Sequence, residues 1–424
     1  MFIVNYPKIA VLTFPGNNCE AETVRALKNQ GFQSEVFLWN REPNELETFD
    51  GVVIPGGFSF EDRGRSGIVS SQEPIFQTLQ KMANTNTPIL GICNGAQMLI
   101  ESGLILSDNN NIPAIALLDN KRTNEQGEII GTGFYHSYRT LKSVNKKTPF
   151  SNFSENIHIP IAHGEGRFTL TPEMEKEVIA KNLIVFTYIN NPNGSFQNAA
   201  AICNPKGNVV AMMPHPERNT NGDPVFASLW NYFQDAENFE LNNQTVSVPN
   251  FANIESEKLN SQEIIVLVRL KISDKTEKTF ENVLGLKDEL LRREKWGFIL
   301  KNAEKKSTAE KITEIAKIII SGELVNLNKQ WVVMKIDGEW YDWNEESKFE
   351  KNKSRFNEND CFIVEAKEDF KGQEKQEHLS HVLPECPIQN ITFGIYWEVP
   401  ANKKEEYINH SLFSSRVGNI IKIF

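Results

Sequence analysis

The 424-residue chain is 40% hydrophobic, 24% charged and 10% aromatic, which is the composition of a folded globular protein rather than of a disordered or fibrous one. Its formal net charge of −10 argues against binding along a nucleic-acid backbone, because such binding requires a basic surface. The length exceeds what a single hydrophobic core usually accommodates, so we expect several domains.

The five cysteines, at positions 19, 93, 203, 361 and 386, form no CxxC pair. This scatter is typical of thiols in a reducing compartment. The first residues lack a basic segment followed by an apolar stretch, and no run of 18 apolar residues occurs. We therefore expect a cytoplasmic protein that binds neither nucleic acid nor a membrane.

Short apolar strands alternate with helical segments in the first part of the chain. Residues 8–14 (KIAVLTF) read as a buried strand and residues 20–30 as a helix, and further strands are expected at 34–38, 51–54 and 88–92. This alternation predicts an α/β fold, a parallel sheet covered by helices. From about 115 to 170 the pattern changes to strand-like pieces split by turns, which indicates an antiparallel insertion. A buried strand is expected again at 209–213 (VVAMM).

The remainder of the chain is expected to hold two small α+β modules. A stretch rich in Asn, Gln, Ser and Glu predicts a linker at 236–261, after a first domain at 1–235. The modules are expected at 262–343 and 361–424, separated by a charged second linker at 344–360. Each has the pattern strand, helix, strand, helix, strand, and each is short enough to need a partner surface for stability.

The segment ILGICNGAQ places Cys93 between two glycines, where a strand ends and a helix begins. This is the pattern of a nucleophile elbow, in which a sharp turn exposes the reactive side chain above the sheet. A helix N-terminus also favours the thiolate form of the cysteine. The alternative is a buried cysteine that only packs.

Two further strand ends carry residues that suit the same chemistry. The strand VVI leads through Pro55 into Gly56 and Gly57. The backbone N–H groups of these two glycines can stabilise an oxyanion together with that of Asn94; a common turn is the alternative. The strand VVAMM leads into Pro214-His215-Pro216-Glu217. His215 can take the thiol proton while Glu217 orients the imidazole, although a lone histidine is more often structural.

Five motifs, PGNNCEAE, PGGFS, GICNGAQ, PIAHGEGRF and MMPHPER, occur in this order over residues 8–235. They resemble those of the class I glutamine amidotransferases, with a flavodoxin-like fold, and more narrowly those of the PurQ glutaminase family. The resemblance implies the catalytic triad Cys93, His215 and Glu217. It also implies an oxyanion and glutamine pocket formed by Gly56, Gly57, Asn94, Gln97, His163, Gly164 and Glu165.

One loop departs from the family pattern. Residues 60–65 (FEDRGR) replace the tyrosine-glycine-aspartate run that usually follows GGFS. In relatives this loop faces the pocket and the partner. The contacts of residues 60–65 are therefore not predicted by the resemblance.

The resemblance places residues 163–167 in a loop beside the glutamine pocket, and a surface turn is the alternative for them.

The segments FGIYWEV (393–399) and LFSSRVGNIIKI (412–423) resemble the closing half of PurS. PurS is the small subunit of the synthase to which the PurQ glutaminases belong. Residues 263–337 resemble a diverged first copy; a generic adaptor domain is the alternative. Tandem copies imply that PurS-like contacts are supplied in cis.

The family resemblance implies a glutaminase that supplies ammonia to a PurL-type synthetase, which converts formylglycinamide ribonucleotide to formylglycinamidine ribonucleotide. Glutamine is then the substrate, no cofactor or metal is expected in this chain, and ATP and Mg²⁺ are expected on the synthetase. Two alternatives stay open: a glutaminase that serves another synthetase, and an inactive amidotransferase fold that acts as a scaffold.

Overall fold

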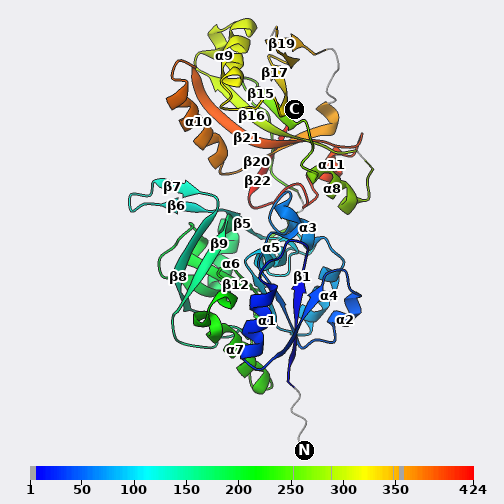
Figure 1. Cartoon of the computed structure of the whole chain (residues 1–424), viewed down its shortest axis with the longest axis vertical. Coiled ribbons are helices and arrows are strands. Elements are labelled where there is room, and N and C mark those ends of the chain that lie inside the picture. The colour runs from blue at the N-terminus through cyan, green and yellow to red at the C-terminus, as the bar shows by residue number, and fades with distance from the viewer. Residues whose placement is uncertain (1–5, 252, 288, 347, 353–357) are drawn as a thin grey trace, which may run out of the picture. The chain divides into compact units, whose positions relative to one another are not determined.

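Two nine-stranded sheets organise the chain, one in each of the units 1–252 and 253–424 (Figure 1). The computed structural model describes residues 6–251, 253–287, 289–346, 348–352 and 358–424. Within these residues, no helix has both the length and the apolar character needed to cross a membrane.

The sheet of the first unit has the strand order β2-β1-β3-β4-β13-β12-β11-β8-β9. Its strands are β1 (Lys8–Thr13), β2 (Gln33–Leu38), β3 (Gly51–Ile54), β4 (Ile89–Ile92), β8 (Tyr135–Ser143), β9 (Ile157–His163), β11 (Ile184–Tyr188), β12 (Ala199–Cys203) and β13 (Val209–Met212). The five strands from β2 to β13 pair in parallel. In β3, β4 and β13 every residue is buried, as is typical of a parallel sheet with both faces covered.

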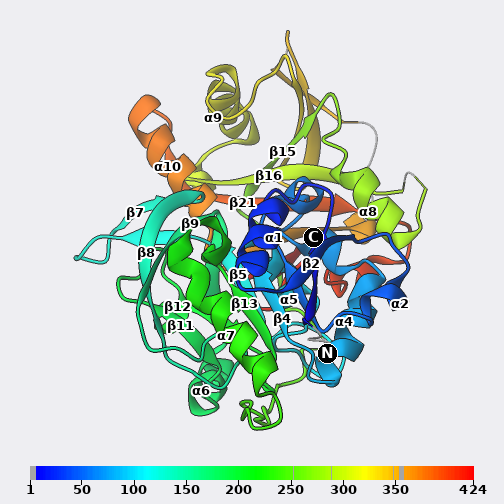
Figure 2. The ribbon, with the colours of Figure 1, turned by 60° about the horizontal axis from the view of Figure 1, so that its bottom comes forward.

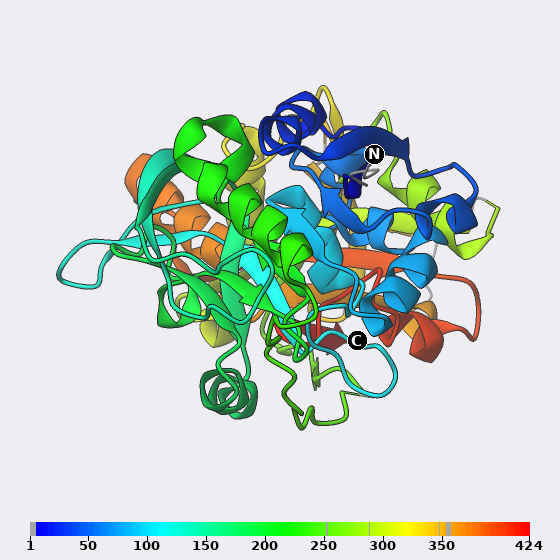
Figure 3. The ribbon, with the colours of Figure 1, turned by 90° about the horizontal axis from the view of Figure 1, so that it is seen from below.

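Helices cover this sheet on both faces. They are α1 (Glu20–Asn29), α2 (Pro43–Leu46), α3 (Ile68–Ser71), α4 (Ile75–Asn84), α5 (Asn94–Glu101), α6 (Pro172–Ala180) and α7 (Asp223–Gln234). Figures 2 and 3 show α7 beside α1, and these two helices are in contact. Helix α5 packs against β4 and β13. The predicted α/β fold with a parallel sheet is therefore confirmed.

The antiparallel insertion is also confirmed. Strands β8 and β9 pair antiparallel and extend the main sheet. Two smaller ladders join β5 (Ile115–Asp119) to β10 (Glu165–Leu170), and β6 (Lys121–Thr123) to β7 (Ile129–Thr132). Strand β9 ends at His163 and β10 begins at Glu165, so the insertion carries the expected pocket residues 163–165.

The stretch expected as a linker at 236–261 is divided between the two units. Val246, Val248 and Phe251 pack against the core of the first unit, and Asn242 donates to the carbonyl oxygen of Lys181 at 3.1 Å. The polar composition of this stretch predicted a linker, but its apolar side chains pack against the core of the first unit. The boundary between the units accordingly lies at residues 252 and 253.

The second unit contains one sheet with the order β14-β22-β20-β21-β16-β15-β17-β18-β19. Its strands are β14 (Ser256–Lys258), β15 (Ile264–Leu270), β16 (Leu291–Leu300), β17 (Gln330–Ile336), β18 (Glu339–Asn344), β19 (Lys348–Lys351), β20 (Cys361–Ala366), β21 (Ile388–Glu398) and β22 (Asn419–Ile423). Its helices are α8 (Thr276–Leu284), α9 (Thr308–Ile320), α10 (Phe370–Val382) and α11 (Lys404–Ile408).

This unit is an internal repeat. The runs β15-α8-β16-α9-β17 and β20-α10-β21-α11-β22 have the layout that the sequence predicts for the two modules. In each run the first strand lies between the other two, and the second strands, β16 and β21, pair antiparallel. Trp296 and Phe393, which precede the matching glycines of these strands, face each other with ring centroids 4.8 Å apart. An approximate two-fold axis therefore passes through this pair.

Both expected modules thus lie in one compact unit and share one sheet, because the long strands β16 and β21 cover each other's edges. Part of the stretch expected as a second linker, at 344–360, is regular structure: β19 runs from Lys348 to Lys351. Residues 252, 347 and 353–357 of the two expected linkers lie outside the described residues.

Candidate active site

Cys93 is the single residue between β4 and α5, and its backbone is strained. It has φ 50° and ψ −104°, a conformation that costs a non-glycine residue free energy and that marks nucleophile elbows. The glycines around it serve close packing. A Cβ at Gly95 would lie 2.1 Å from the carbonyl oxygen of Ile54, so only glycine lets α5 approach β3 this closely.

The order of the strands brings three predicted motifs to one edge of the sheet. β3 and β13 flank β4, in register from Val53 opposite Leu90 and from Met212 opposite Ile92. Because parallel strands end at the same edge, Gly56, Cys93 and His215 all emerge there. A Cβ placed on Gly56 would lie 2.7 Å from Cε1 of His215 and 3.4 Å from Cβ of Cys93.

His215 and Glu217 form a buried pair. Nδ1 of His215 lies 2.7 Å from Oε1 of Glu217, and both side chains are at most 1% exposed. Burial by itself lowers the pKa of His215, but the negative charges of Glu217 and Cys93 outweigh it and hold this pKa well above its ordinary value. The arrangement favours an imidazolium at His215, which suits a base that activates a cysteine nucleophile.

The oxyanion donors predicted from the sequence are backbone N–H groups, and that of Cys93 is not among them. The N–H of Cys93 donates to the carbonyl oxygen of Met212 at 2.8 Å and is already used, whereas Asn94 begins helix α5 and Gly57 follows β3. The thiol of Cys93 lies 3.5 Å from the carbonyl oxygen of Ala162 on β9. The N–H groups of Gly57 and Asn94 remain the predicted oxyanion donors.

A chain of hydrogen bonds ties the other predicted pocket residues together. The Asn94 side chain accepts from the N–H of Ser59 at 2.9 Å and donates to Oε1 of Gln97 at 2.9 Å. Gln97 donates in turn to the carbonyl oxygen of Glu165 at 2.7 Å. These contacts join the loop after β3, the helix α5 that follows Cys93, and the strand β10. The three segments therefore form one connected framework.

His163 and Gly164 are held by Asn120, a residue that sequence reasoning did not single out. Asn120 lies 3.1 Å from Nδ1 of His163, and its N–H donates to the carbonyl oxygen of Gly164 at 2.9 Å. Burial and the positive charge of His215 lower the pKa of His163 to about 3, so this imidazole is neutral at physiological pH. His163 therefore lies close enough to His215 for the charge of His215 to lower the pKa of His163.

The loop that departs from the family pattern folds back onto this framework. Phe60, Glu61 and Asp62 all have positive φ, and Asp62 accepts from the Asn94 side chain at 3.3 Å. Arg65 makes two hydrogen bonds to Glu101, at 3.0 and 2.8 Å. Burial raises the pKa of Asp62 to about 6. The loop is therefore hydrogen-bonded to helix α5 at both Asn94 and Glu101.

Glu165 is partly buried and lies next to this loop. Its Oε2 accepts from the N–H of Ser66 at 3.1 Å. Burial, reinforced by the neighbouring carboxylates Asp119 and Asp62, raises the pKa of Glu165 to about 7, although the Ser66 hydrogen bond and Arg65 act in the opposite direction. A carboxyl group with such a pKa is unusual and marks a functional region.

Tyr188, at the end of β11, is a second residue that sequence reasoning missed. Its ring is 2% exposed, and its hydroxyl is buried without a hydrogen-bond partner among the described residues. Burial and the nearby charge of Cys93 raise its pKa. No local motif identifies Tyr188, because only the antiparallel pairing of β11 brings it toward the nucleophile.

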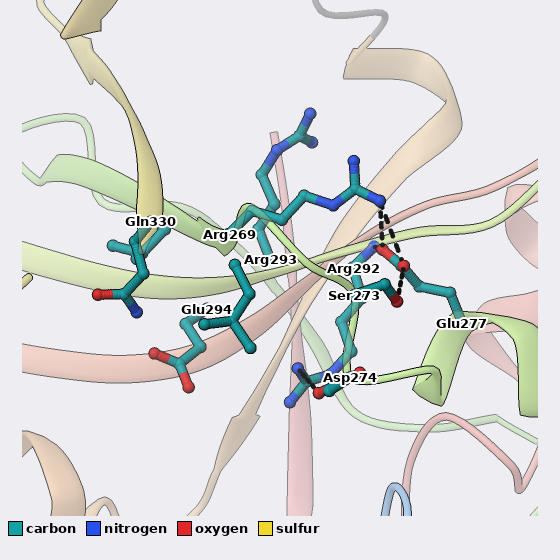
Figure 4. Close-up of a pocket in the computed structure, with 10 residues that line it drawn as sticks. Arg269, Ser273, Asp274, Glu277, Arg292, Arg293, Glu294 and Gln330 are labelled. Atoms are coloured by element: carbon teal, nitrogen blue, oxygen red, sulfur yellow. Dashed lines mark hydrogen bonds and ion pairs between the residues drawn. The ribbon is translucent and has the colours of Figure 1, made fainter. Parts of the chain in front are cut away.

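The second unit contains a separate cavity of about 100 Å³, lined mainly by charged side chains (Figure 4). Arg269 pairs with Glu277 at 3.2 Å, and Arg292 pairs with Asp274 at 3.4 Å. Because these guanidinium groups are already neutralised by acids of the same cavity, we assign no ligand to it.

Comparisons with known proteins identify the family of the first unit. A model of the CobB/CobQ-like glutamine amidotransferase domain matches residues 6–245. The subunit PurQ of phosphoribosylformylglycinamidine synthase from Methanothrix thermoacetophila is 42% identical over 228 residues, which cover 50% of this chain and 86% of the relative.

Solved structures are also similar. A chain of PurLQS from Thermotoga maritima is 32% identical, with 54% of this chain and 99% of that chain covered and a TM-score of 0.43. A glutamine amidotransferase from Thermotoga maritima is 17% identical, with 55% of this chain and 85% of that chain covered and a TM-score of 0.31.

The family match spans more than half of the chain, and the similarity to PurQ covers most of that relative. The chain therefore belongs to the CobB/CobQ-like glutamine amidotransferases and, within them, to the PurQ family, and it is an enzyme, the glutaminase component of a phosphoribosylformylglycinamidine synthase.

Proposed function

We propose that Cys93 releases ammonia from glutamine and that a PurL-type synthetase uses this ammonia to make formylglycinamidine ribonucleotide from formylglycinamide ribonucleotide. The observation that carries the proposal is the buried His215–Glu217 pair, 2.7 Å apart, beside a cysteine on a strained elbow. A structural cysteine needs neither the strained backbone nor an imidazole of raised pKa.

In the proposed reaction, the thiolate of Cys93 attacks the side-chain amide carbon of glutamine, and the oxyanion is stabilised by the N–H groups of Gly57 and Asn94. The C–N bond then breaks, and ammonia leaves with a proton from His215. Water attacks the resulting thioester with His215 as base, which frees glutamate and restores the thiol. Glu217 holds the imidazole in position throughout.

This chemistry needs no cofactor in the chain itself, since every step is a proton transfer or an acyl transfer. Activation of the ribonucleotide is assigned to ATP and Mg²⁺ on the synthetase. The five cysteines are free thiols, which supports a reducing compartment and hence the cytoplasm.

We also propose that the second unit replaces a PurS-type small subunit and bridges the glutaminase unit to the synthetase. The support is its internal repeat, in which two βαβαβ runs share one sheet across β16 and β21. Two such modules in one chain supply in cis a pair that separate small subunits would otherwise have to form.

The test uses two fragments, 1–252 and 253–424, cut at the observed boundary. Fragment 1–252 should react at Cys93 with a diazo-ketone analogue of glutamine as fast as the whole chain, whereas synthesis coupled to the synthetase should fall. Adding fragment 253–424 should restore part of that synthesis. A cut at residue 240 is a control, because it removes Val246, Val248 and Phe251 from the core and should destabilise the first unit.

The outcomes separate the alternatives. If fragment 1–252 supports synthesis as well as the whole chain, the bridging role of the second unit is wrong. If the whole chain raises product only with a synthetase for another acceptor, the acceptor is wrong while the glutaminase stands. A whole chain without glutaminase activity alongside any synthetase would indicate a scaffold.

A further inference from the structure

A cysteine other than the nucleophile lies beside the catalytic pair. Sγ of Cys19, a ring nitrogen of His215 and a carboxylate oxygen of Glu217 all lie within 4.8 Å of one another. All three residues are buried, with exposed fractions of 2%, 1% and 2%. Zinc holds sulfur at about 2.3 Å and nitrogen or oxygen at about 2.0 Å, so its ligand atoms lie roughly 3 to 4 Å apart. The observed upper limit of 4.8 Å is close to that spacing.

Two atoms of this cluster lack the partners that buried polar atoms normally have. Nε2 of His215 and Oε2 of Glu217 are buried without a hydrogen bond of standard geometry in the described part of the chain. Buried polar atoms are rarely left in this state, because each loses its hydration without compensation. Oε2 of Glu217 is an electron-pair donor, and Nε2 of His215 becomes one when the imidazolium loses its proton, so a cation can satisfy both atoms.

The donor set identifies the kind of cation. One thiolate, one imidazole and one carboxylate form a combination that zinc and related transition ions prefer, whereas Mg²⁺ and Ca²⁺ prefer oxygen ligands alone. The thiolate and the carboxylate together neutralise a divalent ion.

Arg218 is compatible with this arrangement. Its guanidinium donates to Sγ of Cys19 at 3.2 Å. An N–H···S bond stabilises a thiolate and persists when the sulfur binds a metal, in the manner of the outer hydrogen bonds that support metal ligands. Cys19 also caps the N-terminus of α1, where negative charge is favoured.

We propose that Cys19, His215 and Glu217 form a site for Zn²⁺ that reversibly inhibits the glutaminase; the effect on activity rests on the proposed roles of His215 and Glu217. Binding releases the thiol proton of Cys19 and one proton of the His215 imidazolium, and it changes no oxidation state. A metal on Nε2 takes the lone pair that the base requires. A metal on Nδ1 replaces the proton shared with Glu217. Either position stops proton transfer.

Binding is tested first without the nucleophile. The full-length Cys93→Ala chain is titrated with Zn²⁺ against a chromophoric chelator, and one ion per chain is expected. Adding Cys19→Ser should weaken this binding by at least about tenfold. Cys386→Ser is the matched control, since it removes a buried thiol of the second unit, and it should leave binding unchanged. Two results would overturn the site. One is a Cys93→Ala chain that binds no Zn²⁺, and the other is Zn²⁺ binding that stays unchanged when Cys19→Ser is added to that chain.

A spectroscopic measurement covers the case in which Cys19→Ser does not fold. Co²⁺ added to the Cys93→Ala chain should produce a thiolate-to-metal charge-transfer band, because Cys19 is then the ligand, and absence of the band would overturn the site. In the unsubstituted chain, Zn²⁺ should inhibit the glutaminase, a chelator should reverse the inhibition, and Mg²⁺ should have no effect. A chain that lacks glutaminase activity before zinc is added would count against the proposed function, while the binding result would stand by itself.

Discussion

Gly56 lies directly against the imidazole of His215, with no space for a side chain between them. A Cβ at position 56 would lie 2.7 Å from Cε1 and 3.3 Å from Nδ1 of His215. The absence of a side chain at Gly56 therefore sets the position of the proposed base relative to Cys93.

The substitution Gly56→Ala should lower kcat by about 100-fold or more, because displacement of a catalytic group by a fraction of an ångström disrupts its alignment. Gly338→Ala is the control, since this glycine lies in the second unit and its Cβ would meet no atom within 4 Å. Glutaminase rates and melting temperatures of both variants check this. Equal rates in the two variants would contradict the role assigned to the contact.

Replacing Cys93 by Ala should abolish glutamine-dependent synthesis and leave ammonia-dependent synthesis by the partner intact. Cys203 is the control thiol, because burial raises its pKa to about 12 and keeps it unreactive. Mass spectrometry after treatment with a diazo-ketone analogue should find the label on Cys93 alone. A label on Cys203, or glutamine use by Cys93→Ala, would show that another group is the nucleophile.

Replacing Glu217 by Gln should lower kcat by at least about 100-fold with little change in KM, because the carboxylate orients His215 rather than substrate. The carboxylate also helps to hold the pKa of His215 above its ordinary value. The limb of the pH–rate profile that reports loss of the imidazolium proton should therefore move to lower pH in the variant. An effect confined to KM would place Glu217 in the substrate pocket instead.

Replacing Tyr188 by Phe should lower kcat/KM by about tenfold if the orphan hydroxyl hydrogen-bonds to bound glutamine, since such a bond contributes about 1.5 kcal/mol. Because the hydroxyl has no partner in the described residues, its removal should not lower the melting temperature. Kinetics and thermal unfolding of the variant separate the two effects. A drop in stability with unchanged kinetics would make Tyr188 a packing residue.

Replacing Glu165 by Gln should change how stability depends on pH. The folded-state pKa of Glu165 is raised to about 7, so between the unfolded value of 4.5 and pH 7 the folded chain binds more protons than the unfolded chain. Glu165 therefore makes the folded state less stable as pH rises through this window. The melting temperature of the variant relative to the parent should increase from pH 5 to pH 8, and a constant difference would contradict the raised pKa.

Much of the candidate active site could be predicted from local sequence, because each part of it follows directly on a buried strand. The elbow around Cys93, the glycines 56 and 57 and the pair His215 and Glu217 were all identified in this way. Short apolar runs separated by helical segments also predicted the parallel sheet, since that pattern depends only on neighbouring residues.

Other features depend on pairings between distant segments, and local patterns carry no information about them. Tyr188 and Asn120 reach the site through antiparallel pairing with and within the insertion. Cys19 lies near His215 because α1 packs against the turn that contains Glu217. In the second unit, the sequence determined two βαβαβ runs. Only the tertiary structure decided that they share one sheet, because the exposed edges of β16 and β21 are satisfied by pairing with each other.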